Sequence, residues 1–287
     1  MTTKIEWVHR PGTIPESWNF IGGCTPVSEG CVNCWAAELA ATRLKNHPLY
    51  QGTAEIFRDH ARWTGLIRTD EEQFERPLHW TKPRTVFVCS TSDIAHLEFH
   101  HLTAIMDVMA RADKHTFLLL TKRPQRLMDG IKGWLNYRGT TPLKNVWIGV
   151  SAENQKRLDE RWPLLRQIPA AVYFLSIEPC LGPISLPGSF LSLGKQSWCI
   201  VGGETGKWAR PMPPNAPIDL LAQCKSVTPE IPFFFKQAGE WIADKPLVNS
   251  YTEGGVWQLV NGSWMARVGK KAAGRLLNGK EWDEFPG

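Results

Sequence analysis

Short apolar runs alternate with helical patterns along most of the chain after residue 85. Six runs are nearly continuously apolar, as expected when both faces of a parallel strand are buried; they cover 85–90, 116–121, 145–151, 172–177, 198–202 and 232–236. The segment after the first run carries Leu102, Ile105, Met106 and Met109 at helical spacing. This repeated βα pattern predicts an α/β protein with a parallel sheet. A further strand at 18–21 would make the sheet seven-stranded.

Helices, an insertion and a C-terminal extension complete the predicted organisation. The later helices are expected at 125–135, 153–167 and 217–225, with Pro163 kinking or dividing the second and Asn215 capping the third. The segment from about 46 to 84 is predicted to be an irregular insertion. Beyond it we expect one core domain over 1–240 and an extension over 241–287. In that extension Asn261-Gly262 predicts a hairpin with a type I′ turn, and a short basic helix follows.

Three of the seven cysteines lie close together near the N-terminus. Cys24, Cys31 and Cys34 have the spacing C-x6-C-x2-C, in a loop over 22–35 that a helical pattern follows. The other cysteines are scattered singly and are predicted to be small buried hydrophobic residues; they are Cys89, Cys180, Cys199 and Cys224. Three clustered thiolates suit a zinc ion completed by a distant fourth ligand, or a [4Fe–4S] cluster with one open iron. A purely structural role is the third interpretation.

Polar side chains follow the predicted strands at their carboxyl ends, where parallel α/β folds gather their active groups. The candidates are Ser90, Thr91, Ser92, Asp93, Lys122, Arg123, Ser151, Glu153, Asn154, Ser176, Glu178, Gly202, Gly203 and Glu204. Any one of them alone is explained by a cap or a turn. Together they predict a rim that binds a zwitterion with a ribose, because carboxylates accept from ammonium or hydroxyl groups while Lys and Arg pair with carboxylates or phosphates.

Composition and charge narrow the class of protein only slightly. The chain has 287 residues, of which 43% are hydrophobic, and its odd number of cysteines excludes complete disulfide pairing within the chain. Because it lacks an apolar stretch of about 18 residues and an apolar signal core, we expect no membrane span and a cytoplasmic location. The net charge of +5 permits a polyanionic partner, and the 14 tryptophans serve packing or stacking on planar groups.

A cysteine loop ahead of an open βα barrel resembles the radical S-adenosylmethionine superfamily. The usual superfamily spacing is C-x3-C-x2-C, so the gap of six residues is a departure. A closer resemblance, over nearly the whole chain, is to a phage-associated radical-SAM-like family that long carried only an unknown-function label, in which this gap is normal. The matching segments are GCTPVSEGCVNCWA (23–36), LTKRPQRL (120–127), WIGVSAEN (147–154), FLSIEP (174–179), IVGGETG (200–206), FFFKQ (233–237) and VGKKAAGRLL (268–277).

This resemblance implies a partial, open parallel β/α barrel of the TIM type and a [4Fe–4S] cluster on Cys24, Cys31 and Cys34. The open iron would bind S-adenosylmethionine, whose one-electron cleavage gives a 5′-deoxyadenosyl radical. An external electron donor such as a flavodoxin or ferredoxin is implied. The residues from Ser90 to Asp93 would lie near the amino group of S-adenosylmethionine. Its ribose would lie near Ser151, Glu153 and Asn154, its carboxylate near Lys122 or Arg123, and the remaining rim residues would complete the contacts.

The substrate is predicted from the same resemblance. Members of the family resemble enzymes of phage DNA hypermodification, so we expect an isomerase that rearranges an amino-acid-modified thymidine, such as a glycine adduct, in the infected host cell. The net charge and the basic residues Lys270, Lys271 and Arg275 agree with a DNA substrate. Two alternatives stay open: a radical enzyme acting on a peptide, RNA or small molecule, and a non-enzymatic, zinc-bound nucleic-acid-binding module.

Overall fold

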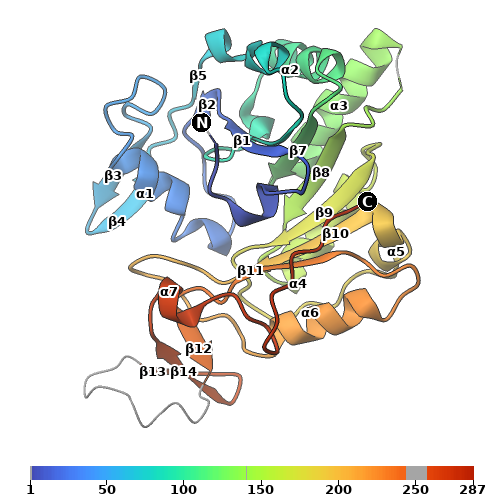
Figure 1. Cartoon of the computed structure of the whole chain (residues 1–287). Coiled ribbons are helices and arrows are strands. Elements are labelled where there is room, and N and C mark those ends of the chain that lie inside the picture. The colour runs from blue at the N-terminus through green and yellow to red at the C-terminus, as the bar shows by residue number, and fades with distance from the viewer. Residues whose placement is uncertain (1, 140, 244–256) are drawn as a thin grey trace. The chain divides into compact units, whose positions relative to one another are not determined.

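The computed structural model describes residues 2–139, 141–243 and 257–287, and these form two compact units (Figure 1). Unit 1 contains the residues up to Ser151 together with Asp159–Phe174. Unit 2 contains Ala152–Leu158 and the residues from Leu175 onward. The predicted domain boundary near residue 240 stays a prediction.

The main sheet is built from the predicted apolar runs. Its strand order is β1-β6-β7-β8-β9-β10-β11, with bounds β1 Ile14–Trp18, β6 Arg84–Val88, β7 Thr116–Thr121, β8 Val146–Ser151, β9 Val172–Ile177, β10 Ser197–Gly202 and β11 Phe233–Gln237. The pairs β1–β6, β6–β7, β7–β8 and β10–β11 are parallel. All six strands predicted after residue 85 are confirmed within two residues. The protein is therefore a mixed α/β protein, consistent with an open parallel β/α fold.

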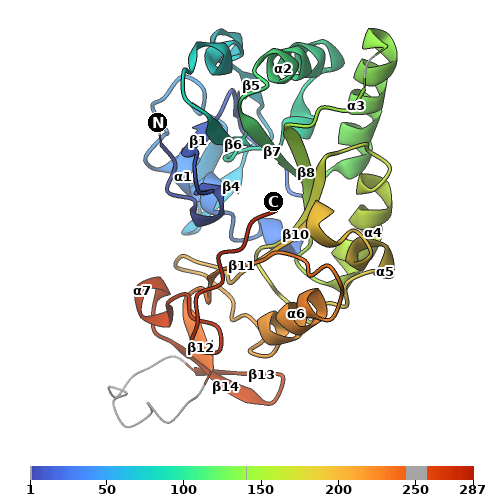
Figure 2. The same ribbon diagram turned by 45° about the vertical axis from the view of Figure 1, so that its right-hand side comes forward.

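Seven α-helices lie in the described ranges: α1 Trp35–Ala41, α2 Phe99–Arg111, α3 Pro124–Arg138, α4 Gln155–Leu165, α5 Gly188–Leu191, α6 Ala216–Lys225 and α7 Lys270–Ala273. In unit 1, α2 and α3 pack side by side (Figure 2), and the four periodic residues predicted to face the core from α2 are buried. None of the helices in the described part of the chain is long and apolar enough to cross a membrane.

Two details of the predicted helices are corrected. Pro163 lies inside α4 without dividing it, and the helix ends two residues later. Asn215 precedes α6, but its side chain makes no cap hydrogen bond. Its backbone is already helical, with φ −83° and ψ −20°, whereas a capping side chain usually comes from an extended residue.

The early strand lies before the predicted position 18–21. Strand β1 ends at Trp18, and Ile21–Gly22 forms the short strand β2, which pairs antiparallel with β5 (Arg68–Thr69) outside the main sheet. The true strand was hidden by Pro15, which an edge strand tolerates, and by the polar residue Glu16. The Glu16 carboxylate is buried because Arg84 binds it at 2.8 Å and Arg76 at 3.3 Å.

The insertion predicted to be irregular contains a regular hairpin. Strands β3 (Ala54–Phe57) and β4 (His60–Trp63) pair antiparallel across a two-residue turn. Both turn residues, Arg58 and Asp59, have positive φ (46° and 65°), which is the backbone of a type I′ turn. The prediction was wrong because the turn lacks glycine and the strands are too short to reveal their alternation.

The C-terminal extension has the predicted hairpin. Strands β13 (Trp257–Val260) and β14 (Ser263–Arg267) pair antiparallel, and Asn261 and Gly262 both have positive φ, as the type I′ turn requires. The predicted start of the hairpin at residue 256 lies outside the described residues. A third strand, β12 (Trp241–Ala243), pairs with β14. The basic helix α7 has only four residues, because Gly269 and Gly274 on either side of it have positive φ.

Candidate functional site

The three clustered cysteines lie in one loop of unit 1 and differ from the other four in exposure. Cys24, Cys31 and Cys34 are free thiols of intermediate exposure, whereas the four scattered cysteines are free and buried, as predicted. Cys31 ends a 3₁₀ turn that begins at Glu29, and Cys34 immediately precedes α1. The loop therefore holds three partly exposed cysteine residues within one short segment.

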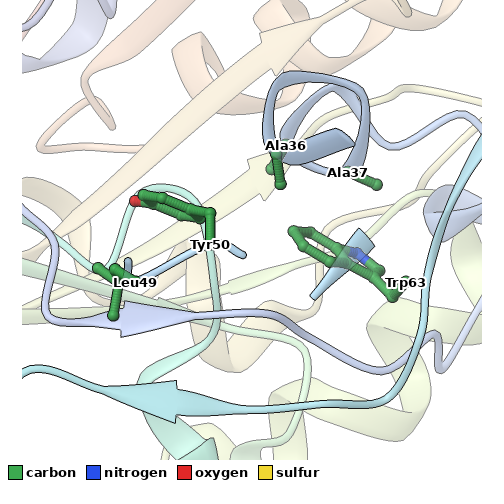
Figure 3. Packing of buried hydrophobic residues seen from close by; sticks show 6 residues of the cluster. Ala36, Ala37, Leu49, Tyr50 and Trp63 are labelled. Carbon is green, nitrogen blue, oxygen red and sulfur yellow. The ribbon is translucent and has the colours of Figure 1, made fainter. Parts of the chain in front are cut away.

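A small apolar core supports this loop (Figure 3). It is formed by Ala36, Ala37 and Ala40 of α1 together with Leu49, Tyr50 and Trp63. The side chains of Cys24 and Cys34 pack against it, and so do Ala54 and Ala61 of the β3–β4 hairpin. Small alanines on α1 allow the helix to approach the hairpin closely. The loop, α1 and the hairpin thus share one core.

Two glycines before Cys24 let the chain pass close to its neighbours. A Cβ at Gly22 would lie 1.9 Å from the carbonyl oxygen of Leu49, and one at Gly23 would lie 2.0 Å from that of Leu66. Gly23 also has φ +89°, which side-chain-bearing residues rarely adopt. The start of the cysteine loop is therefore fixed by two close backbone approaches.

We expect Gly22→Ala to destabilise the protein by roughly 1–3 kcal/mol, the usual cost of overpacking, because the opposing atoms belong to the backbone of Leu49. Urea unfolding monitored by tryptophan fluorescence measures this change. Gly188→Ala is the matched control, since a Cβ there meets nothing within 4 Å. Equal unfolding midpoints for the two variants would show that the close approach at Gly22 does not constrain the loop.

The residues that follow β6 lie beside the cysteine loop and bind its surroundings. The Ser90 hydroxyl donates to Asn19 Oδ1 at 3.1 Å, and the Ser92 hydroxyl donates to the carbonyl oxygen of Gly23. The Thr91 hydroxyl and the Tyr50 hydroxyl share a buried hydrogen bond of 2.7 Å. The structure thus brings the predicted Ser90–Asp93 segment to the cysteines, and its three hydroxyls each engage the protein.

Asp93 and Arg123 form the polar centre of the site. The buried Asp93 carboxylate accepts from the Thr121 hydroxyl at 2.7 Å, and from two backbone amides, those of Lys122 at 3.0 Å and Ala95 at 3.1 Å. Arg123 Nη1 donates to Asp93 Oδ2 at 3.0 Å and lies 3.8 Å from the Cys24 sulfur. Its Nη2 binds both the carbonyl and the hydroxyl oxygen of Thr25. Arg123 therefore clamps the cysteine loop to the end of β7.

Burial alters the acid–base behaviour of this centre. It raises the pKa of Cys24 to about 11, against the opposing field of Arg123, while Asp93, Cys34 and Cys31 raise it further. It also raises the pKa of Cys34, an effect opposed by the nearby amides of Ala37 and Ala36 and by Lys122. The pKa of His96 is lowered to about 4 by burial and by Arg123, and its Nε2 atom is buried without a hydrogen-bond partner.

We expect alkylation of Cys24 in the metal-free chain to become about tenfold faster for each pH unit up to about pH 11. Only the thiolate reacts, and below its pKa of about 11 the Cys24 thiol stays protonated. Peptide mapping after brief iodoacetamide treatment between pH 7 and 11 measures the rate. In urea, where the chain is unfolded, the increase in alkylation rate should end near pH 8.5, which is about the ordinary pKa of a cysteine thiol. A folded chain that levels off at the same pH would contradict the burial of Cys24.

The cysteine loop contains thiol groups that could serve as metal ligands. The three thiols lie in one loop, with Arg123 Nη1 3.8 Å from the Cys24 sulfur and Lys122 as a further cation near Cys34. Among the residues that the structure describes, no group of three or more His, Cys, Asp or Glu side chains is arranged to hold a metal ion. The donor set fits a cluster with three protein thiolates in kind, and loading requires the loop to bring the three sulfur atoms together.

The second set of predicted residues lies in unit 2. Lys236 Nζ pairs with Glu178 Oε1 at 2.9 Å, and the Ser176 hydroxyl donates to Glu178 Oε2 at 3.4 Å. A Cβ at Gly202 would lie 2.8 Å from Glu178 Oε1, so a side chain at this position would crowd the carboxylate. Gln237 is buried beside them, and its Oε1 atom has no hydrogen-bond partner. These groups form a polar cluster at the carboxyl ends of β9, β10 and β11.

Several predicted contact residues have structural partners. Glu204 binds Arg210 through its guanidinium at 2.6 and 2.9 Å and through its backbone amide at 2.8 Å. Asn154 Oδ1 accepts from the amide of Arg157 at 3.1 Å and so caps α4. The backbone carbonyl of Ser151 accepts from Arg161 at 2.6 Å, and Glu153 is fully buried. At Gly203 a Cβ would collide with the carbonyl oxygen of Ala238.

The structure thus brings part of the predicted set together in two groups, one in each unit, whereas Ser151, Asn154 and Glu204 have other partners. The unit 1 group joins the cysteines to the segments after β6 and β7, and the unit 2 group centres on Glu178. Sequence reasoning did not find Thr25, Tyr50 or Arg210, whose roles depend on partners between 6 and 98 positions away. Only the position of Arg210, six residues after Glu204, offered a local signal.

The fold and the site define a mixed α/β protein with a parallel sheet and a three-cysteine loop beside the ends of β6 and β7. The chain belongs to the family described as "Protein of unknown function (DUF5131)", whose model matches residues 2–286. No curated protein and no solved structure matches the chain. The family description assigns no activity, so a function has to be argued from the residues of the site.

Proposed function

We propose that this protein is a radical S-adenosylmethionine enzyme that binds a [4Fe–4S] cluster through Cys24, Cys31 and Cys34. The observation that carries the proposal is the contrast between these three partly exposed cysteines in one short loop and the other four, which are buried and come from separate segments of the chain. Thiolates are the usual ligands of iron–sulfur clusters. The sequence resemblance supports the same assignment.

The residues around the loop have roles of their own in this proposal. Arg123, fixed by Asp93 and Thr25, holds the loop against the end of β7 and places positive charge beside the Cys24 sulfur. That charge favours the thiolate over the thiol and partly neutralises an anionic cluster. The Ser92 hydroxyl holds the backbone of Gly23 and so orients the loop at its start.

The bound cluster would supply one electron to S-adenosylmethionine, which breaks into methionine and a 5′-deoxyadenosyl radical. The cofactor needs partners for its carboxylate, amino group and ribose. In unit 1 the cations Lys122 and Arg123 are candidates for the carboxylate. These assignments stay predictions.

Metal identity separates this proposal from the zinc-bound module. We expect the chain reconstituted anaerobically with iron and sulfide to be brown, with broad visible absorbance and about four irons per chain. A colourless protein that retains one zinc ion and excludes iron would favour the non-enzymatic alternative. Zinc bound to the same thiolates is colourless, so the two outcomes are distinct.

For the substrate we propose an amino-acid-modified thymidine in phage DNA, rearranged by hydrogen abstraction. The support is the sequence resemblance together with the positive net charge. A base in duplex DNA would have to be flipped out to be reached. Incubation of modified phage DNA with the reconstituted enzyme, followed by mass spectrometry of its nucleosides, tests this. An isobaric product with altered retention is expected, and unchanged nucleosides would favour a peptide, RNA or small-molecule substrate.

A further inference from the structure

The β3–β4 hairpin has two chemically different faces. Residues Ala54, Ala61 and Trp63 lie on the face that packs against the core beneath the cysteine loop. The opposite face carries Glu55, Phe57, His60 and Arg62, and all four are exposed. An apolar inner face explains why the hairpin is folded. It does not explain an exposed aromatic side chain on the outer face.

Exposed apolar side chains are frequent in the stretch of sequence that contains the cysteine loop and this hairpin. Of the thirteen large hydrophobic residues that are exposed in the described chain, six fall between residues 27 and 66: Val27, Val32, Trp35, Ile56, Phe57 and Leu66. This stretch is a small part of the chain, so the exposure is not spread evenly. Concentrations of exposed apolar groups mark interaction surfaces more often than isolated ones do.

The same part of the chain is strongly basic. The segment 42–69, from the end of α1 to the end of β5, holds five cations and two carboxylates, which is +3 of the chain's net +5. All five cations are exposed; they are Arg43, Lys45, Arg58, Arg62 and Arg68. Of the four acidic residues that follow at 70–75, Glu71 pairs with His101 and Glu75 with Arg111. The surface of this segment is therefore complementary to a polyanion.

Phe57 is an exposed aromatic ring with two arginine side chains beside it. The guanidinium carbon of Arg62 lies 4.0 Å from the centroid of the Phe57 ring, and that of Arg58 lies 5.3 Å from it. Arg62 also pairs with Glu55 at 2.7 Å, but both side chains are about half exposed, and such pairs contribute little. A phosphate can therefore compete for Arg62, while Phe57 offers a base its ring to stack on.

We propose that the β3–β4 hairpin is a nucleic-acid-binding ribbon, in which Phe57 stacks on a base and the exposed arginines hold phosphates. The excess of five cations over two carboxylates favours a polyanionic strand as the partner. The proposal deepens the proposed function and relies on it for the nature of the substrate. The shared core of the hairpin and the cysteine loop would then couple binding of the strand to the site.

The test uses the full-length, metal-free chain, so that it does not depend on the cluster. Binding of fluorescein-labelled single-stranded and duplex DNA is measured by anisotropy between 50 and 200 mM salt. We expect Phe57→Ala to weaken binding of single-stranded DNA about 5- to 150-fold, which corresponds to 1–3 kcal/mol for one stacked base. Arg62→Gln should lower the slope of log affinity against log salt by about 0.7.

Tyr137 and Arg138 provide matched controls in the same unit. Arg138 of α3 lies over the exposed Tyr137 ring at 5.3 Å and pairs with Asp107 of α2, which repeats the chemistry of Arg62, Phe57 and Glu55. Tyr137→Ala and Arg138→Gln should leave the affinity and the salt slope unchanged. Circular dichroism and urea midpoints check that the exposed substitutions leave the fold intact.

Two results would overturn the proposal. One is a wild-type chain that binds neither DNA at 50 mM salt. The other is binding that Phe57→Ala and Arg62→Gln leave unchanged, which is also the result expected if the ribbon contacts a protein. Neither result bears on whether the reconstituted enzyme cleaves S-adenosylmethionine, so failure of the ribbon and failure of the proposed function are distinguishable.

Discussion

Replacing Cys24 by alanine is expected to abolish cleavage of S-adenosylmethionine and to reduce the iron content of the reconstituted protein. Cys24 is one of three proposed ligands. The one cysteine of unit 1 outside the loop is Cys89, which is buried. The cleavage rate should fall by about 100-fold or more. Even a change of a residue that only orients a metal ligand lowers metal affinity or activity by roughly 10- to 100-fold. Iron analysis and chromatography of the cleavage products measure both effects.

Cys224→Ala is the matched control for this experiment. Cys224 is buried in α6 of unit 2, where its thiol is hydrogen-bonded to that of Cys199. Its loss should lower the unfolding free energy by about 1 kcal/mol, within the usual range for single substitutions, and leave iron content and cleavage in place. If Cys224→Ala lost iron to the same degree as Cys24→Ala, the assignment of the cluster to the loop would be wrong.

Arg123→Ala is expected to produce the largest effect among residues that are not cluster ligands. It would leave the buried Asp93 carboxylate without its cation and free Thr25 and the cysteine loop from β7. Breaking a buried pair typically costs 3–5 kcal/mol; we expect about 3 kcal/mol, because three other donors to Asp93 remain. Urea unfolding measures the loss of stability, and reconstitution measures the expected fall in iron content.

Two further variants separate the clamp from a general charge effect. Arg123→Lys keeps the charge but lacks the planar fork that reaches both Asp93 and Thr25, so it should restore stability only in part. Arg126→Ala removes a cation three residues away that pairs with Glu98 at 3.4 Å, and both side chains are more than half exposed. That change should cost less than about 1 kcal/mol. Similar losses for Arg123→Ala and Arg126→Ala would refute the clamp.

The strands of the main sheet could be predicted from the sequence because their burial on both faces leaves a continuous apolar run. The run 172–177, for example, is confirmed at both ends. The elements that were missed have mixed faces. Strand β1 contains Glu16, whose burial depends on Arg76 and Arg84 at least 60 positions away. The β3–β4 hairpin buries only one face and turns on Arg58 and Asp59, which give no glycine signal.

The candidate site was predictable in its location and less so in its contacts. Parallel strands place their carboxyl ends at one edge of a sheet, which is why Asp93 and Arg123 were both expected there and are found 3.0 Å apart. Tertiary packing decides which groups donate hydrogen bonds to each carboxylate. Glu204 is bound by Arg210 and Asp93 by four donors, and neither set follows from strand order.

The most direct test of the proposed function is the release of 5′-deoxyadenosine by the reconstituted chain. The wild-type protein, loaded anaerobically with iron and sulfide, would be reduced with dithionite in the presence of S-adenosylmethionine and analysed by liquid chromatography with mass spectrometry. We predict 5′-deoxyadenosine and methionine in equal amounts, and none from Cys24→Ala treated identically. A protein that binds a [4Fe–4S] cluster at full occupancy but releases no 5′-deoxyadenosine above the Cys24→Ala level would contradict the account.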